Sequence, residues 1–233
     1  MTRLVLFDID GTLLSARGAP RRAFGRALVE VYGMAGPVTT HPFDGKTDPQ
    51  IARELLALGG ISDAAVDDGL PELWRVYARE LHDELSAPGH ETLVLPGVHA
   101  LLSALDGLDG QVVLGLLTGN IERGATLKLE SAGIGTAFRV GAYGSDRERR
   151  DALPQLAVER ARALTGRTFR AREIVVVGDT PHDVTCGRAL DVHTVAVATG
   201  RHDRDALSAA GAHHAFDDLS DTAAVLDALF GAS

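Results

Sequence analysis

Cysteine and long apolar runs are the two features that this sequence has least of. Cys186 is the single cysteine, which excludes an intrachain disulfide framework and a zinc site built from several thiolates. No apolar run approaches the roughly 18 residues that a membrane-spanning helix needs, so we expect no membrane partner. The first residues enter a strand pattern directly, without a cleavable signal, and the reducing cytoplasm is therefore the expected compartment.

Positive charge is also scarce. The chain carries 23 basic and 32 acidic side chains, a formal net charge of −9. We therefore expect no broad basic face for nucleic acid, although a local basic pocket is compatible with this balance. Lysine occurs only as Lys46 and Lys128, so a role that needs an ammonium group has two candidate side chains.

The rest of the composition is that of a folded globular protein. Hydrophobic residues make up 45% of the 233 positions, enough apolar surface for a packed core. Short apolar runs alternate with helical patterns, which is typical of an α/β fold with a parallel sheet between two helical layers. We therefore expect a Rossmann-like three-layer core. Its predicted strands cover residues 3–7, 112–117, 139–143, 173–177, 194–198 and 214–216.

The segment 14–92 interrupts this alternation. It shows no convincing strand, and its three helical stripes of apolar residues most simply form the core of a helical unit. Thr47-Asp48-Pro49 marks a helix start, because a capping side chain precedes a proline in the first turn. We interpret 14–92 as an α-helical cap inserted into an α/β core that comprises 1–13 and 93–233.

Two carboxylates follow the first predicted strand. Asp8 and Asp10 stand at the end of an apolar run, and Gly11 permits a sharp turn after them. Ligands of open α/β sheets lie beyond the carboxyl ends of the strands. Two carboxylates held close together there either share a cation or titrate at different pH values. An Asx-turn at a strand end is the structural alternative.

A second acidic pair, Asp179 and Asp183, follows the strand predicted at 173–177. Carboxylate oxygens are hard ligands that suit Mg²⁺. If the first and fourth strands are neighbours in the sheet, Asp8 and Asp179 face one crevice. Taken alone, Asp179 could instead cap a helix that starts near Pro181.

A third polar motif, Thr118-Gly119-Asn120, follows the strand predicted at 112–117 and precedes a helical pattern. The free N–H groups at such a helix start and the Thr118 hydroxyl suit a phosphate oxygen. The same residue types also make an ordinary strand-to-helix turn, so this motif is weak by itself.

In this order, and at strand ends, the motifs resemble those of the haloacid dehalogenase (HAD) superfamily. The segments that carry the resemblance are Asp8-x-Asp10-Gly11-Thr12, Thr118, and Gly178-Asp179-x-x-x-Asp183. The helical segment after the first motif resembles the phosphoglycolate phosphatase-like branch, and the resemblance covers nearly the whole chain. It implies that Asp8 is a nucleophile, Asp10 a general acid and base, and Thr118 a phosphate-binding hydroxyl.

The resemblance also implies a Mg²⁺ site. Its ligands would be Asp8, the backbone carbonyl of Asp10, and Asp179, with Asp183 either a ligand or a neighbour of the ligands. The acid at position 10 favours phosphoryl transfer, because the dehalogenases of this superfamily lack an acid there.

One position departs from the family pattern. The superfamily usually has a lysine before the third core helix, and the segment 146–154 contains none. An arginine must replace it, and Arg150, four residues before Pro154, matches best, with Arg147 and Arg149 as alternatives. Arginine keeps its charge and can bridge two oxygens, so the electrostatic role is preserved. A solvated run of charges before a helix is the structural alternative.

Within the cap, Gly45, Lys46 and Thr47 lie in a polar loop at a helix start. In related enzymes the cap loops contact the part of the substrate beyond the phosphate, so we expect this loop to do so. Simple helix capping with a surface lysine is the alternative.

The predicted function is a Mg²⁺-dependent phosphatase that hydrolyses a small phosphorylated metabolite through an aspartyl phosphate, acting as a monomer or homodimer. A phosphosugar mutase uses the same core motifs, and a carbon–phosphorus hydrolase would need Lys46 for an imine. A non-catalytic module that binds a phosphorylated ligand or a protein is the alternative outside enzymes, although it has no need of a nucleophile beside an acid. The sequence does not identify the metabolite.

Overall fold

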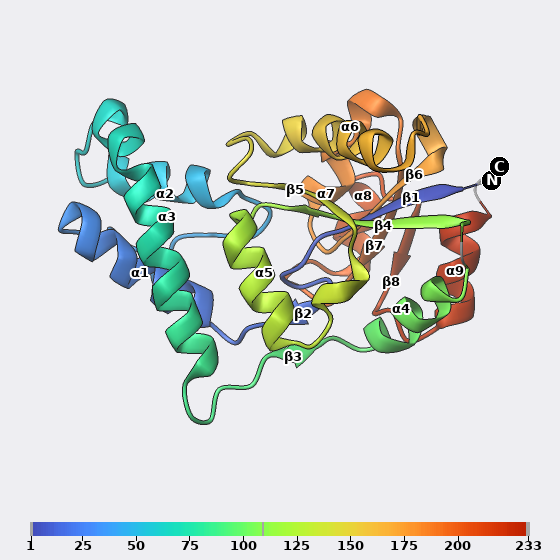
Figure 1. The fold of residues 1–233 in the computed structure, drawn as a ribbon, viewed down its shortest axis with the longest axis horizontal. Coiled ribbons are helices and arrows are strands. Elements are labelled where there is room, and N and C mark those ends of the chain that lie inside the picture. The colour runs from blue at the N-terminus through green and yellow to red at the C-terminus, as the bar shows by residue number, and fades with distance from the viewer. Residues whose placement is uncertain (1, 109, 232–233) are drawn as a thin grey trace.

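The computed structural model describes residues 2–108 and 110–231, and its centre is a six-stranded parallel sheet. The strand order is β5-β4-β1-β6-β7-β8, and every neighbouring pair is parallel (Figure 1). All six strands predicted from the sequence are present, with bounds that differ by at most one residue at either end. They are β1 (Arg3–Phe7), β4 (Val112–Thr118), β5 (Val140–Tyr143), β6 (Ile174–Gly178), β7 (His193–Val197) and β8 (His214–Phe216).

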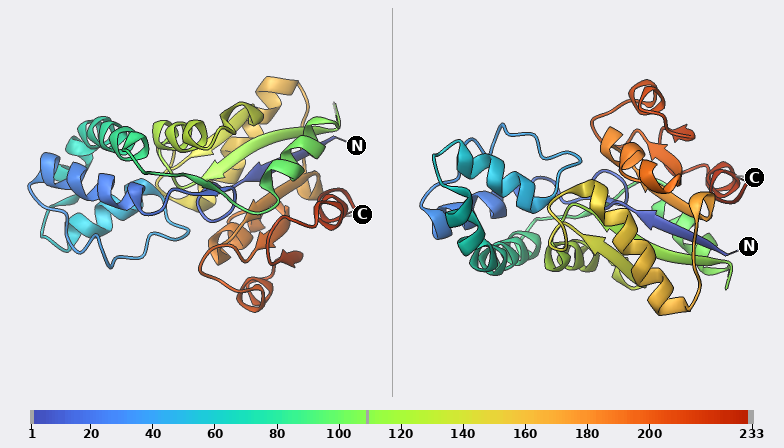
Figure 2. Two further views of the ribbon diagram at one scale, coloured as in Figure 1. Left: turned by 90° about the horizontal axis from the view of Figure 1, so that it is seen from below. Right: turned by 90° about the horizontal axis from the view of Figure 1, so that it is seen from above.

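Alternate residues of β1 point into two different hydrophobic clusters. Val5 and Phe7 pack in a cluster with residues of the helices α4, α5 and α9, whereas Leu4 and Leu6 pack in a cluster with residues of α6. A strand buried on both faces reads as a continuous apolar run, as β1 does. The α/β prediction with helices on both faces of the sheet is confirmed (Figure 2). The helices are α4 (Val98–Asp106), α5 (Glu122–Ser131), α6 (Leu153–Thr165), α7 (Pro181–Cys186), α8 (Arg204–Ala209) and α9 (Thr222–Phe230).

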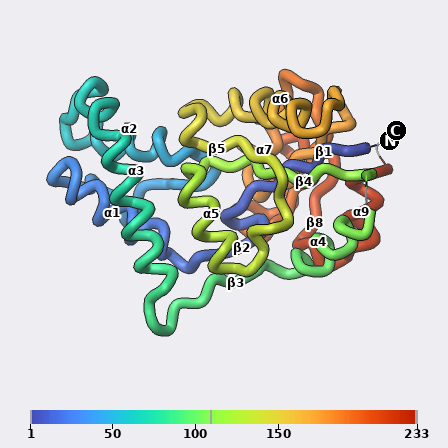
Figure 3. The backbone as a smooth tube through the Cα atoms, viewed as in Figure 1, coloured from blue at the N-terminus to red at the C-terminus, as the bar shows by residue number. Residues whose placement is uncertain are grey.

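Three further helices form a separate helical unit at one end of the sheet (Figures 1 and 3). They are α1 (Ala19–Tyr32), α2 (Asp48–Ala57) and α3 (Asp63–Ser86), and they share a hydrophobic cluster that also includes Ile121 and Leu127 at α5. Phe24 of α1 packs edge-on against Tyr77 of α3, with ring centroids 5.0 Å apart. Thr47 caps α2 as predicted, because its side chain accepts a hydrogen bond from the Gln50 N–H.

A short ribbon that the sequence did not predict links this unit to the sheet. Leu14–Ser15 (β2) pairs antiparallel with Leu93–Val94 (β3), so the expectation of no strand in 14–92 is wrong at its first residues. Two-residue strands carry no periodic signal, and this pair joins positions far apart in the chain. The ribbon lies where the chain passes between sheet and helices, and the division into 1–13, 14–92 and 93–233 remains our proposal.

Within the described residues, no helix is both long and apolar enough to cross a membrane. The 24-residue α3 is the longest helix, and it carries charged side chains along its length.

Replacing Leu6 by alanine tests the packing of the central strand. Leu6 of β1 is fully buried in the hydrophobic cluster that β1 shares with α6. Leu6→Ala should therefore lower the free energy of unfolding by about 2–5 kcal/mol. Leu58→Ala is the matched control, because Leu58 is 67% exposed, and should change it by less than about 0.5 kcal/mol. Urea unfolding measures both, and equal effects would contradict the assigned core.

Candidate active site

The ends of β1 and β6 lie side by side. Phe7 is in register with Val177, and the N–H of Asp8 donates to the Val177 carbonyl at 2.9 Å. Asp8 and Asp179 each stand one residue beyond the end of their own strand. The sequence-based prediction that the first and fourth strands are neighbours is therefore confirmed, and both acids face the carboxyl edge of the sheet.

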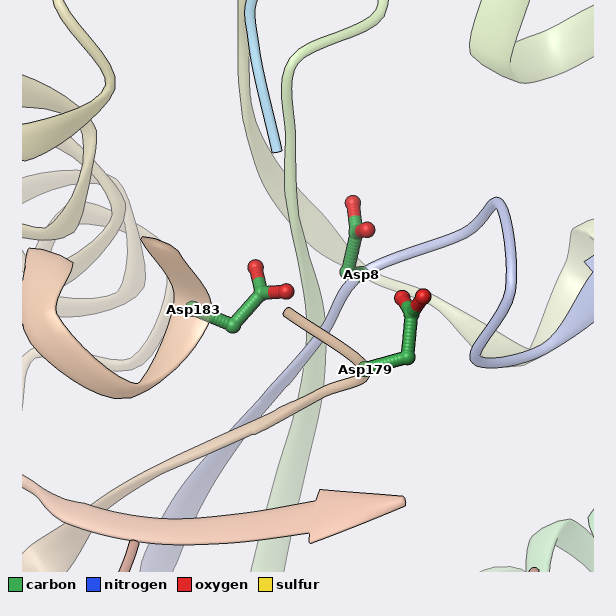
Figure 4. Close-up of side chains that lie close together, drawn as sticks. All are labelled: Asp8, Asp179 and Asp183. Atoms are coloured by element: carbon green, nitrogen blue, oxygen red, sulfur yellow. The ribbon is translucent and has the colours of Figure 1, made fainter. Parts of the chain in front are cut away.

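Three buried carboxylates meet at this edge. Asp8, Asp179 and Asp183 are at most 5% exposed, and each offers an oxygen within 4.8 Å of the other two (Figure 4). Hard oxygen donors at this spacing are the ligand set that Mg²⁺ prefers in proteins, so these residues fit the ion that the sequence analysis predicted. The side chain of Asp10, also a predicted metal residue, lies outside this cluster and binds other partners.

The Asp179 carboxylate is held between two glycines. A Cβ on Gly11 would lie 2.4 Å from its Oδ2, and a Cβ on Gly200 would lie 1.8 Å away. Gly11 also has a φ of +85°, a conformation that other residues adopt at a cost. The Thr12 hydroxyl donates to Asp179 Oδ1 at 3.1 Å, so both oxygens have fixed positions.

Burial and mutual repulsion raise the pKa values of two of these acids. The pKa of Asp8 is raised to about 6, mainly by burial. Repulsion by Asp183 and Asp10 also raises this pKa, whereas the positive charge of Arg150 lowers it. Burial, followed by repulsion from Asp183 and Asp8, raises the pKa of Asp179 to about 9. Both carboxylates are thus short of positive charge, which a divalent cation would supply.

Arg150 is the basic side chain that enters the cluster. It is 7% exposed, its guanidinium lies 3.2 Å from Asp8 Oδ1, and it also donates to Asp183. The other oxygen of Asp183 accepts hydrogen bonds from the N–H and the hydroxyl of Thr180. Arg147 instead bonds a neighbouring carbonyl, and Arg149 pairs with Asp151 on the surface.

The motif after β4 lies beside Asp10. Thr118 is fully buried, and the Asn120 side-chain amide donates to Asp10 Oδ2 and to Thr118 Oγ1, each at 2.8 Å. Gly119 lies under the loop before α2, since a Cβ there would come within 2.0 Å of the Lys46 carbonyl. The structure therefore brings all three predicted residues to the site, with the Asn120 amide directed at protein groups.

The loop before α2 is docked on the loops at the edge of the sheet. The N–H of Asp48 donates to the Gly119 carbonyl at 2.8 Å, and Asp48 Oδ2 accepts from the Ile121 N–H at 2.8 Å. The Thr47 hydroxyl donates to the Glu148 carbonyl at 2.6 Å. These bonds join the helical unit to the edge of the sheet at which the acids lie.

A cavity of about 260 Å³ lies between the helical unit and the sheet. Asp8, Asp10 and Asp179 line it from the sheet side, while Gly45 and Lys46 line it from the helical unit. Lys46 also forms an ion pair with Glu54 of α2. Thr47, the third predicted loop residue, is fully buried and acts as the cap of α2 instead of lining the cavity.

Comparison with known proteins agrees with this geometry. Residues 5–197 match the model of a family described as haloacid dehalogenase-like hydrolase. The chain is 30% identical over 223 residues to a phosphoglycolate phosphatase of Pseudomonas putida, covering 94% of this chain and 78% of that protein. It is 28% identical to a phosphoglycolate phosphatase of Rhodospirillum rubrum, covering 94% and 89%. A hydrolase of Pseudomonas syringae has a similar fold, with a TM-score of 0.71, 22% identity, and 97% and 98% of the two chains covered.

The chain belongs to the haloacid dehalogenase-like hydrolase family. The resemblance inferred from the three motifs is therefore confirmed, and the overall fold is similar to that of the Pseudomonas syringae hydrolase.

Two site residues of this haloacid dehalogenase-like hydrolase were not predicted from its sequence. Lys128 of α5 is 2% exposed and donates to both carboxylate oxygens of Asp10, at 2.8 and 2.6 Å. Asp48 was expected only as part of a helix start, yet its buried carboxylate contacts the Ile121 N–H. The rarity of lysine was a usable signal, because both lysines of the chain line the cavity.

The raised pKa of Asp179 predicts how stability varies with pH when divalent cations are removed. Between pH 7 and 9 the folded protein keeps a proton that the unfolded chain has already released, because the folded pKa of about 9 lies above the ordinary 3.8. This stabilisation is lost as the pH rises through the folded value. In EDTA, the melting temperature should therefore fall from pH 7 to 9.

Mg²⁺ should raise the melting temperature, and by more at pH 9 than at pH 7, because a cation binds the ionised acids. The variant Asp179→Asn should lose the pH slope in EDTA. A melting temperature that is insensitive to both pH and Mg²⁺ in the unaltered protein would contradict the assigned cation site.

Proposed function

We propose that this hydrolase is a Mg²⁺-dependent phosphatase that cleaves a small phosphomonoester, such as phosphoglycolate, through an aspartyl phosphate. The observation that carries the proposal is the group of buried acids Asp8, Asp179 and Asp183, of which Asp8 and Asp179 line one cavity together with Asp10. The phosphoglycolate phosphatases among its relatives support the same substrate class.

Asp8 is the proposed nucleophile. One of its oxygens forms a bond to phosphorus while the bond from phosphorus to the ester oxygen breaks, and Asp10 gives that leaving oxygen a proton. In the second step Asp10 takes a proton from water, which attacks phosphorus and releases Asp8 and inorganic phosphate. Asp8, Asp179 and the Asp10 backbone carbonyl would hold a Mg²⁺ ion. Its positive charge would offset the repulsion between Asp8 and the anionic phosphate.

Arg150 and Thr118 are the proposed phosphate-binding side chains. Arg150 already lies 3.2 Å from Asp8, so its positive charge is next to the oxygen that would attack. Arginine retains its charge at any physiological pH, which suits it to the place that a lysine usually holds in the family. Asp183 is proposed to act on the ligands indirectly, because its two oxygens already bind Arg150 and Thr180.

The helical unit is the proposed cap that encloses the substrate. Gly45 and Lys46 line the cavity opposite the acids, so they would lie beside the part of the substrate beyond the phosphate. A volume of about 260 Å³ is compatible with a small metabolite.

Replacing the nucleophile is the decisive test of this function. With Mg²⁺, the unaltered protein should release inorganic phosphate from 2-phosphoglycolate or from an aryl phosphate, and Asp8→Asn should lower kcat by at least about 10³-fold. Asp151→Asn is the matched control, since Asp151 is exposed and pairs with Arg149 on the surface, and should retain full activity. Unchanged turnover in Asp8→Asn would overturn the mechanism.

The product of the reaction separates the phosphatase from its alternatives. Phosphorus NMR of a mixture of phosphorylated metabolites should show inorganic phosphate accumulating. Transfer of the phosphoryl group within a sugar phosphate, without free phosphate, would identify a mutase instead. Tight binding of a phosphorylated ligand without any turnover would identify a binding module.

A further inference from the structure

Lys128 is a buried ammonium group whose partners belong to the active site. It lies on α5, at 2% exposure, and its Nζ donates to Asp10 Oδ1 at 2.8 Å and to Oδ2 at 2.6 Å. A third bond, of 2.5 Å, goes to Asn120 Oδ1. All three ammonium protons therefore have partners, and two of them hold the same carboxylate.

The Asn120 side chain closes this arrangement into a network. Its amide nitrogen donates to Asp10 Oδ2 and to Thr118 Oγ1, while its oxygen accepts from Lys128. Asp10 is thus bound from two directions by side chains that follow β4. The Asp10 side chain is still 42% exposed, so its carboxylate remains accessible from the cavity.

This arrangement is costly for a purely structural role. A buried ammonium loses its hydration, and the free energy of that loss is recovered only when the group is fully paired. An apolar side chain of similar length at the same place on α5 would avoid the cost. The bonds to Asp10 are made within the sheet-bearing part of the chain, so they do not require a particular position of the helical unit.

We propose that Lys128 is a positioning residue that, with Asn120, fixes the orientation of the Asp10 carboxylate for proton transfer. The inference rests on the proposed phosphatase function, in which Asp10 protonates the leaving oxygen and later takes a proton from water. Lys128 acts through Asp10 and exchanges no proton itself. Loss of its charge leaves Asp10 tethered by the Asn120 amide alone, free to turn about that contact.

The test compares two substrates whose leaving groups differ in their need for a proton. The alkoxide that leaves phosphoglycolate is strongly basic and needs protonation, whereas p-nitrophenolate leaves without it. In Lys128→Met, kcat for phosphoglycolate should fall by about 10²-fold, within the range that general acid catalysis contributes. The first-turnover burst of p-nitrophenolate should stay within about 5-fold of the unaltered protein, and KM for both substrates within about 3-fold.

Three controls make the result specific. Glu130→Gln removes an exposed charge from the same helix and should leave both activities unchanged. Lys128→Gln keeps an N–H donor without the charge, and should fall between Lys128→Met and the unaltered protein. In an Asp10→Asn background, adding Lys128→Met should lower the rate of phosphoglycolate cleavage by less than about 3-fold, because residues that act through each other are not additive.

The outcomes separate this inference from the proposed function. An equal loss with both substrates, a rise in KM alone, or a lowered melting temperature that accounts for the lost activity would show a phosphate-binding or structural Lys128 and overturn the inference. Full activity of Lys128→Met and Lys128→Gln would overturn it while leaving the phosphatase intact. An unaltered protein that cleaves neither substrate would overturn the phosphatase function and the inference together.

Discussion

Mutual repulsion among three buried carboxylates is the constraint around which the site is built. The parallel pairing of β1 with β6 places Asp8 beside Asp179, and the capping turn of α7 adds Asp183. Charges so close together and away from water raise one another's cost of ionisation. Arg150 offsets part of that repulsion, and a divalent cation bound to the acids would offset the remainder, as the proposed chemistry requires.

Positive charge is concentrated around these acids. The overall charge of the chain is −9, yet five basic side chains line one cavity: Arg17, Arg21, Lys46, Lys128 and Arg150. Arg150 faces the nucleophile, and Lys128 faces Asp10, so the two acids proposed for catalysis have separate cationic partners. Lys46 is already paired with Glu54 in the helical unit.

The sequence predicts what depends on short-range pattern. The strands β1, β4 and β6 are nearly continuous apolar runs, and the order of the sheet, in which β1 lies beside β6, then brings Asp8 and Asp179 together. Arg150 was expected from the resemblance to the HAD superfamily, since it stands four residues before Pro154, and its guanidinium lies beside Asp8. The contact between Lys128 and Asp10 was not predicted, because the two residues are far apart in the sequence and the residues around Lys128 form no motif that indicates it. The pairing of β2 with β3 joins two-residue segments about 80 positions apart and has no local signal.

Diffraction from crystals grown with Mn²⁺ in place of Mg²⁺ tests the shared cation, since the anomalous signal locates the ion independently of the protein. We expect one strong anomalous peak between the oxygens of Asp8 and Asp179, within coordination distance of both, with Asp183 next to it. A peak elsewhere, or none at saturating Mn²⁺, would contradict a shared cation as the basis of the site.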